Sequence, residues 1–600
     1  MANKTILNNL FSIIRIIEKY DEPRIKVLSN ILISYFNCST IFEVNNEISK
    51  IEILSRKDSN TIQCILQKIR TEENLDKINL YNNICLFFEK LINKKDIGAY
   101  YTKSIVANYL IENSLNYYFC SKVFDNGQIK NSKKTIINEF SKKGKEIQIS
   151  ILRNLKIIDI SCGSGSLIFS CYEYLLPFYQ ETKLSKLESL KSCFENNLYG
   201  IDIDHEAIEI IRLRLNLINL IHFKENEFVI PLNFQICDSL KKNHGEIQKI
   251  IDNGGFDVTL GNPPYIEYGK IKESEGLELF KSFKCKNIYA YFLEKNYSIL
   301  KENGISGMII PISYVSTKRM KPIRELISNN SRFQKISSFA DRPSCLFSGV
   351  HQKINIVISQ KSTGFTGEIL TTKYNHWNSS EEIELFKQLS YQKNNYINNS
   401  FIPKLGNSTD ARILSKIYNG NISLIDLTDK SGSFSCYVNM RIGFWVKTFD
   451  NKQKSNEYKQ FTFGTEKDMI IFNSILNSNL FFFYWETISD CWHLTLDNLK
   501  YFKISYDKVT DTKINNLRKY LKKLEIDLEK NKKGIYSKQT DFEYQHKKSK
   551  IIIDNIDDEL SGIMELKAND INYLKDYQAK YRLNNYFEEY LKQRKNNVFN

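Results

Sequence analysis

The sequence predicts an α/β protein built around an open parallel sheet with helices on both faces. Two observations support this prediction. From Gly98 onward, short apolar runs typical of buried strands alternate with helical patterns, and this alternation is characteristic of parallel sheets. Four of the runs in succession end in polar or glycine-rich residues. In an open parallel sheet such residues gather at one edge, where ligands bind, so we expect a Rossmann-like sheet with its site there.

The four runs are the predicted parallel strands of this sheet. They comprise residues 155–160, 198–204, 233–238 and 256–260. A glycine-rich turn, residues 161–166, follows the first strand, and Asp204 stands where it can cap the helix after the second. Further along the chain we expect a helix from Ile288, a strand at residues 307–310 and a last strand that ends at Ile358.

Composition and periodicity divide the chain into four predicted regions. These regions are 1–95, 96–360, 361–510 and 511–600. The first is a helical N-terminal extension and the last a helical C-terminal tail, because apolar residues recur there at helical spacing: Leu10, Ile13, Ile14 and Ile17 in the first, and Leu517, Leu521, Leu524 and Leu528 in the last. The second region holds the sheet. The third is rich in aromatic and turn residues, so we expect a separate mixed α/β domain.

Overall composition limits the class of protein. No apolar run approaches the ~20 residues that a membrane helix needs, and the first residues lack the features of a secretory signal, so we expect a cytoplasmic protein. The 12 cysteines form no C-x-x-C pair and no Cys/His cluster, which favours reduced thiols and no metal. The net charge of +15 favours a polyanionic partner. However, the whole chain is rich in lysine, asparagine and isoleucine, and such a bias raises the pI without any nucleic acid partner.

The most specific motif is Asn262-Pro263-Pro264-Tyr265, directly after the fourth strand. An amine on a heteroaromatic ring is a poor nucleophile because its lone pair is delocalised, so an enzyme that alkylates it must accept hydrogen bonds from both N–H groups. The Asn262 side chain and the Pro263 carbonyl can do so, while Tyr265 offers a face on which a planar base can lie. The motif therefore indicates methylation of an amino group, although Asn-Pro-Pro is also ordinary turn chemistry.

The glycine-rich turn and two acids at strand ends indicate an adenosine cofactor. Gly163 and Gly165 let the backbone approach a ligand closely at a helix N-terminus. Asp202 can accept hydrogen bonds from both ribose hydroxyls, and Asp238 can accept one from the adenine amine. Each acid alone has a simpler explanation as a helix cap. Their order on successive strands favours a cofactor site.

With these motifs, the chain resembles N6-adenine DNA methyltransferases whose target-recognition domain follows the catalytic domain, in a type II or type IIG-like form without an evident nuclease domain. The resemblance is strong over about residues 97–360. It implies a class I methyltransferase domain, S-adenosylmethionine as cofactor, double-stranded DNA as partner and a bacterial cytoplasmic, nucleoid-associated location. Catalysis then falls to Asn262, Pro263, Pro264 and Tyr265.

The resemblance also assigns roles to residues outside the catalytic loop. It implies that Tyr265 and Phe347 stack on the target base. The implied cofactor-binding residues are Tyr101, Thr102, Asp159, Ser161, Cys162, Gly163, Gly165, Asp202, Ile203, Asp238, Ser239, Asn262 and Phe292. Lys103 and Ile160 stand where the family usually has proline. Both positions shape loops, so these departures concern cofactor affinity and leave the reaction unchanged.

The implied reaction is a direct methyl transfer to an adenine that has left the duplex. Specificity would come from residues after 360, where the aromatic segments 444–445, 481–485 and 491–494 resemble the end of the family's recognition domain. For most of these aromatics, a place in the core is the simpler explanation.

Three alternatives remain open. The first is a modification subunit that requires a separate specificity subunit, with the helical tail as docking surface. The second is a methyltransferase that acts on RNA or on a protein glutamine. The third, a DNA-binding module without catalysis, is the least favoured because the cofactor acids and the catalytic loop are all present. Self-association is also open.

Overall fold

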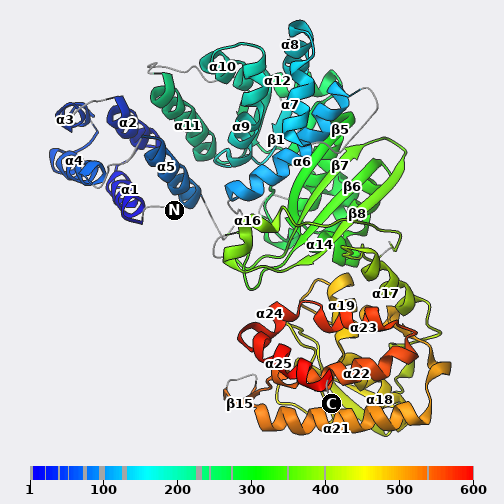
Figure 1. Ribbon diagram of the computed structural model, residues 1–600. Helices are drawn as coiled ribbons and strands as arrows, with labels where there is room; N and C mark the ends of the chain where they lie inside the picture. Colours follow the sequence, from blue (N-terminus) through cyan, green and yellow to red (C-terminus); the bar gives the residue numbers. More distant parts are fainter. Residues whose placement is uncertain are drawn as a thin grey trace.

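The computed structural model describes most of the chain. The described residues are 4–20, 22–37, 41–51, 53–71, 77–92, 102–124, 132–223, 233–241, 245–271, 275–347, 350–396, 400–536 and 540–598. They form two lobes, one above the other in Figure 1. We call them the sheet lobe, which ends at about residue 396, and the C-terminal lobe, which begins after residue 405. Within the described ranges, no helix is long and apolar enough to cross a membrane.

The sheet lobe contains one nine-stranded sheet, in the order β3-β2-β1-β4-β5-β7-β6-β8-β9. The strands are β1 Ile157–Asp159, β2 Leu198–Asp202, β3 Phe234–Ile236, β4 Phe256–Gly261, β5 Leu300–Pro311, β6 Ser331–Phe339, β7 Ile354–Lys361, β8 Thr366–Asn375 and β9 Gln392–Lys393. β3, β2, β1, β4 and β5 are all parallel, whereas β7 lies antiparallel between β5 and β6. The predicted α/β fold class is confirmed.

Helices cover both faces of the parallel half because its strands are apolar on both faces. Ile157 of β1 belongs to a core that includes residues of α6, α9 and α11, while the next residue, Ile158, packs in a second core with residues of α12 and α13. This alternation follows from the two-residue period of a strand. The helices are α6 Ser104–Val123, α9 Ser166–Glu181, α11 His205–Phe223, α12 Gly245–Asp252 and α13 Ile288–Ser298.

The sheet extends past residue 360, where we predicted that this region would end. β8 pairs in parallel with β6 along most of its length, and β9 adds a short edge. The composition changes near residue 360 because β8 is only partly buried, with exposed residues in its first half. The change of composition therefore does not mark the end of the sheet.

The described part of residues 4–92 forms five helices, where a helical extension was predicted. They are α1 Lys4–Ile17, α2 Arg24–Asn37, α3 Ile41–Ser49, α4 Arg56–Thr71 and α5 Lys77–Ile92. Their apolar faces share one core with four residues of α11, namely Ile210, Leu213, Leu217 and Leu220. α11 therefore has two apolar faces, one against the sheet and one against the N-terminal helices, which Figure 1 shows beside it.

The C-terminal lobe combines helices with a small antiparallel sheet. Its longer elements are α17 Ser408–Tyr418, β11 Phe434–Asn439, β13 Tyr458–Phe463, α18 Glu466–Leu476, α19 Asn479–Ile488, α20 Leu496–Tyr501, α21 Asp511–Asn531, α22 Lys550–Ile563, α23 Ala568–Asp576 and α25 Phe587–Val598. Every residue of α19, including the aromatic run 481–485, is buried. α21 packs on α18 and α22, with Leu517, Leu524 and Leu528 buried. The helical tail therefore folds into the same lobe as residues 408–510.

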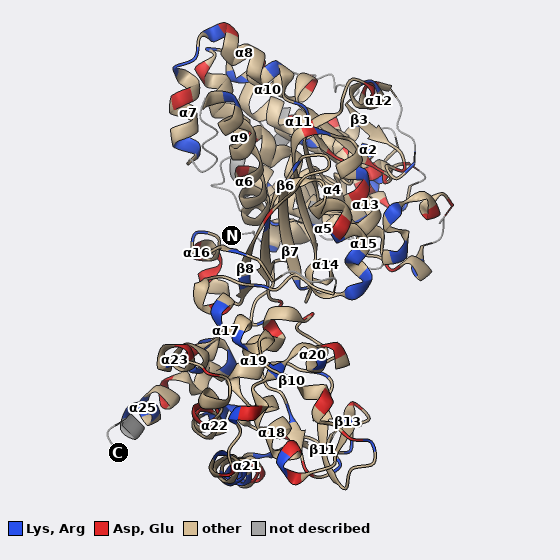
Figure 2. Cartoon of the chain, turned by 90° about the vertical axis from the view of Figure 1, so that its right-hand side faces the viewer, with Lys and Arg blue, Asp and Glu red and all other residues tan. Residues whose placement is uncertain are grey.

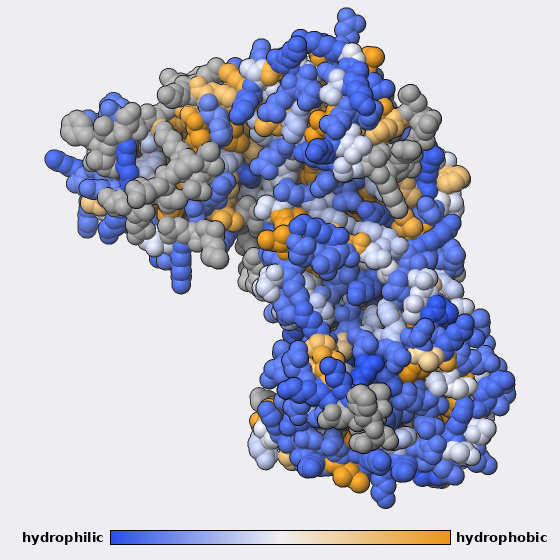
Figure 3. Space-filling view, viewed as in Figure 1, coloured by the Kyte–Doolittle hydropathy of each residue, from blue (hydrophilic) through white to orange (hydrophobic). Residues whose placement is uncertain are grey.

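Buried polar contacts join the two lobes. The backbone N–H of Ile402 donates to the carbonyl of Val315 in the sheet lobe at 2.7 Å, and that of Lys404 donates to the carbonyl of Thr487 in α19 at 2.8 Å. The His376 ring, just after β8, lies 2.9 Å from a carboxylate oxygen of Glu486 in α19, and both side chains are buried. Figure 3 shows the molecule narrowing where these contacts lie, with a hollow beside the narrow part.

Candidate active site

The Asn262 loop lies at the carboxyl edge of the sheet, directly after β4 and between β1 and β5. The Asn262 side chain donates from Nδ2 to Oγ1 of Thr102 at 3.0 Å. Thr102 is buried and comes two residues before α6 begins. Because Thr102 holds the NH₂ group, the Oδ1 atom of Asn262 is fixed as an acceptor in the loop.

The hydroxyl of Tyr265 uses that acceptor. It lies 2.6 Å from Oδ1 of Asn262 and 3.1 Å from the carbonyl of Ile309 in β5. A phenol has one proton, so it donates to one of these acceptors at a time. The Tyr265 ring lies 6.3 Å from the ring of Phe347, measured between centroids. Phe347 itself is 1% exposed, so its ring presents no free face to a base in this conformation.

The glycine-rich turn has the conformation that its glycines permit. Gly163 has φ of 52° and Gly165 φ of 82°, in the left-handed region that other residues avoid. A Cβ on Gly165 would also meet the Ile211 side chain at 2.9 Å, whereas the space at Gly163 is open. Gly163 therefore offers an open place for a ligand, and Gly165 allows the turn to pack on α11.

Two acids fix this turn through backbone hydrogen bonds. Asp159 accepts from the N–H of Ser161 at 2.9 Å, and Asp202 accepts from the N–H of Gly163 at 2.8 Å. Burial raises the pKa of Asp159 to about 7 and also raises the pKa of Asp202. Neighbouring Cys162 is buried, and burial holds its pKa well above the usual value, so its thiol is a packing group and not a nucleophile.

The other oxygen of Asp202 begins a chain of contacts that leads to the N-terminal helices. It accepts from the N–H of Asp204 at 2.9 Å, and Asp204 in turn caps α11 by accepting from the N–H of Glu206 at 3.0 Å. The Glu206 carboxylate receives two hydrogen bonds from Arg24, at 2.6 and 2.7 Å. Sequence reasoning missed Arg24 because 182 residues separate it from Glu206 and no local pattern links them.

Apolar side chains lie exposed beside these acids. Ile203, directly after β2, is 74% exposed, and Ile236, at the end of β3, is 45% exposed. Of these two residues, only Ile203 was predicted to bind the cofactor. Phe292, in α13, is nearly buried in the core on that side of the sheet. Asp238 accepts from the N–H of Leu240 at 3.1 Å.

The structure brings most of the predicted site residues to one edge of the sheet. Ser161 is half-buried, and Ser239 is buried beside Asp238. Pro263 is buried and Pro264 half-buried in the loop after β4. Tyr101 lies outside the described residues. Groups of His, Cys, Asp and Glu that could hold a metal ion are absent from the part of the chain that the structure describes.

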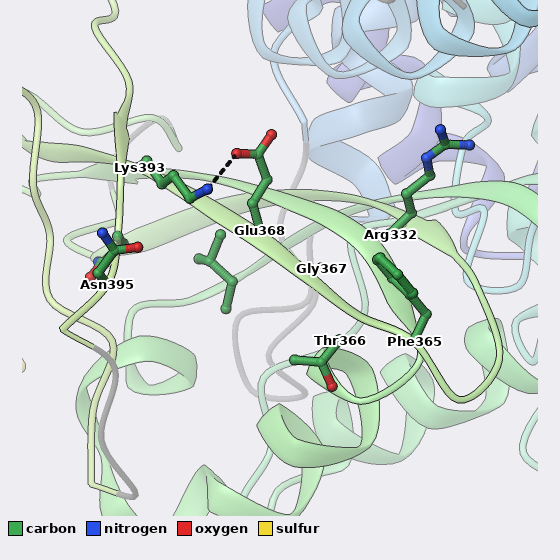
Figure 4. Close-up of a pocket in the computed structure, with 9 residues that line it drawn as sticks. Arg332, Phe365, Thr366, Gly367, Glu368, Lys393 and Asn395 are labelled. Atoms are coloured by element: carbon green, nitrogen blue, oxygen red, sulfur yellow. Dashed lines mark ion pairs between the residues drawn. The ribbon is translucent and has the colours of Figure 1, made fainter.

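A groove of about 470 Å³ lies elsewhere on the sheet lobe. Figure 4 shows its lining, which includes Arg332, Phe365 and the ion pair between Lys393 and Glu368. Arg332 and Phe365 stand at the starts of β6 and β8, which run in the same direction as β5. The groove therefore lies at the opposite edge of the sheet and is not part of the candidate site.

Several known proteins resemble this chain in sequence. Residues 196–345 match the family described as Eco57I restriction-modification methylase. The chain is 28% identical over 326 residues to the type II restriction enzyme and methyltransferase RM.Eco57I of Escherichia coli, covering 47% of this chain and 31% of that protein. It is 22% identical over 337 residues to the adenine-specific methyltransferase PglX of Lacticaseibacillus casei, and the match covers 40% of this chain and 28% of that protein. The predicted resemblance to adenine-specific methyltransferases is confirmed.

A solved structure supports the fold over nearly the whole chain. The type IIL restriction-modification enzyme MmeI, in complex with DNA, superposes with a TM-score of 0.54 at 10% identity, covering 97% of this chain and 98% of that one. The likeness shows a shared fold. The chain spans less than a third of the length of RM.Eco57I and of PglX.

Proposed function

We propose that the chain is a site-specific DNA adenine-N6 methyltransferase that uses S-adenosylmethionine. The arrangement of Asn262 carries this proposal. Its NH₂ group is held by Thr102 at 3.0 Å, so Oδ1 faces the loop as an acceptor. The carbonyl of Pro263 is the second acceptor of the proposed pair.

The residues beside this loop fit the proposed cofactor. The Asp202 carboxylate suits the ribose hydroxyls, and the exposed face of Ile203 suits the adenine ring. The open space at Gly163 suits the methionine part, near Asp159. When bound, S-adenosylmethionine supplies an activated methyl group on a sulfonium centre.

The chain's own residues bind and orient the target base. Asn262 and Pro263 accept the two N–H hydrogens of the adenine amine, which turns the lone pair of the nitrogen away from the ring and toward the cofactor. Tyr265 supplies the face on which the base stacks. Such positioning accounts for up to ~7–11 kcal/mol of a barrier. With the cofactor bound, the methyl–sulfur bond would break as the N–C bond forms, and the amine would lose one proton to solvent, so no strong base is required.

DNA is the proposed substrate because the whole chain has a net charge of +15, and Figure 2 shows lysine and arginine spread over both lobes. We propose that the region after residue 360, folded mostly in the C-terminal lobe, selects the site, and that the protein acts at the bacterial nucleoid in the cytoplasm. Phosphate contacts would make binding weaken steeply with salt.

The test is methylation by the purified full-length chain. DNA carrying random sequences is incubated with S-adenosylmethionine and read by long-read sequencing, with Asn262→Ala as the control. We expect N6-methyladenine at one defined site and none with the variant. Methylation of RNA or of a protein glutamine in parallel reactions, with none on DNA, would show another substrate.

The same reaction tests the partner-dependent alternative. If the pure chain is inactive on every DNA and becomes active when a specificity protein encoded beside it is added, the chain is a modification subunit. Gel filtration with light scattering of the same sample measures self-association.

A further inference from the structure

Trp492 is an exposed tryptophan at the end of the C-terminal lobe that meets the sheet lobe. Its side chain is 37% exposed, whereas Trp377 and Trp485 are fully buried. Trp492 follows α19, which Figures 1 and 2 both show at the top of the C-terminal lobe, next to the sheet lobe. An aromatic ring exposed in this place is available to stack on a nucleic-acid base.

The turn that carries Trp492 is held firmly. The carboxylate of Asp490 accepts from the backbone N–H of Trp492 at 2.9 Å and from that of His493 at 2.8 Å. The indole N–H of Trp485 donates to the carbonyl of His493 at 2.9 Å. Between them, Cys491 has φ of 54°, a left-handed conformation that a residue with a side chain rarely adopts. Strain of this kind, held by surrounding contacts, is concentrated at functional sites.

Trp492 also lies close to the catalytic loop. The Nζ atom of Lys353 is 4.7 Å from the centre of its ring. The carbonyl of Lys353 accepts from the N–H of Ile312 at 3.0 Å, just after β5. In the same strand, Ile309 provides the carbonyl that lies 3.1 Å from the hydroxyl of Tyr265. The exposed tryptophan and the proposed base pocket therefore share one edge of the sheet.

We propose that Trp492 stacks on the DNA bases next to the target adenine and stabilises the duplex from which that adenine has left. This inference rests on the proposed function. A base that leaves the stack exposes the faces of its neighbours, and an aromatic ring can cover one of them. Lys353 holds the ring at the right place through its charge over the indole.

The experiment uses three variants of the full-length chain: Trp492→Ala, Trp492→Phe and the control Phe365→Ala. Phe365 is a comparably exposed aromatic residue, 51% exposed, at the opposite edge of the sheet.

DNA affinity is measured by fluorescence anisotropy on a duplex that contains the methylated site. Flipping is measured from 2-aminopurine placed at the target position. We expect Trp492→Ala to lose affinity by roughly 10- to 100-fold, as for one lost stacked base, and to give less 2-aminopurine fluorescence. Trp492→Phe should retain most of both, and Phe365→Ala should match the wild type.

A second duplex separates stacking from a merely structural role. A mismatch opposite the target adenine lowers the cost of flipping, so the defect of Trp492→Ala should shrink on this duplex. Cofactor affinity and melting temperature should equal those of the wild type. The inference is overturned if Trp492→Ala has an equal defect on both duplexes, or if its DNA affinity equals that of Phe365→Ala. In either case, methylation by the wild type leaves the proposed function unaffected. If the wild type methylates no DNA, the proposed function itself falls.

Discussion

Removal of one hydroxyl separates the two roles that Tyr265 has in the proposed site. Tyr265→Phe keeps the ring and deletes the group that lies 2.6 Å from Oδ1 of Asn262. That hydrogen bond is neutral and half-buried, so its net value is about 0.5–1.5 kcal/mol. It also occupies one of the two lone pairs of Oδ1, the atom that would accept from the target amine. Loss of the hydroxyl therefore weakens the loop slightly and leaves the acceptor more accessible.

We expect Tyr265→Phe to change kcat by no more than about 10-fold and to leave the KM for DNA within about threefold of wild type, because stacking, worth ~1–3 kcal/mol, is retained. Tyr265→Ala should raise the KM by a further factor of about 10 to 100. The assay is transfer of tritiated methyl groups to a duplex with the mapped site. If Tyr265→Phe were as defective as Tyr265→Ala, the hydroxyl and not the ring would be the functional group, and the stacking argument would be wrong.

Three further predictions concern the cofactor half. Asp202→Ala and Asp238→Ala should weaken S-adenosylmethionine binding in calorimetry without changing the methylated site; unchanged affinity in both would contradict their assignment. Arg24→Ala should weaken cofactor binding by about 3- to 10-fold, since its ion pair with Glu206 is one-quarter exposed and is worth about 1 kcal/mol. The double variant Arg24→Ala with Glu206→Ala should be no worse than either single variant. Additive losses would show that the contact does not act through Asp202. Burial raises the pKa of Asp159 to about 7, so the folded protein holds this proton and stability should fall as pH rises from about 4 to about 7. Asp159→Asn should therefore melt higher than wild type at pH 8 and similarly near pH 4. Equal melting temperatures at pH 8 would refute this.

Features that depend on neighbouring residues could be predicted from the sequence. Short apolar runs with polar punctuation predicted the strand ends at Asp159, Asp202 and Gly261 to within two residues. The cap at Asp204 follows from its place before a helix. Each of these depends on interactions within a few residues, so a local pattern carries the necessary information.

Long-range contacts were missed for the opposite reason. The hydrogen bond from Asn262 to Thr102 joins residues 160 apart, and the pair of Arg24 and Glu206 joins residues 182 apart. β8 was missed because its first residues are mostly exposed and polar, so that it resembles a loop in composition. A single sequence carries no signal for which distant segments meet.

The buried contacts between the lobes have a consequence for engineering. Ile402 and Lys404 tie one short segment to both lobes at once, and His376 reaches Glu486 from the end of β8. A C-terminal lobe grafted from a relative would bring its own α19, and a donor without a carboxylate at the position of Glu486 would leave Nε2 of His376 without this buried partner. Chimeras joined within residues 376–404 would separate residues that make these contacts between the lobes. Exchanges that keep residues 376–404 and α19 from one parent should preserve the angle between a grafted lobe and the loop that carries Asn262.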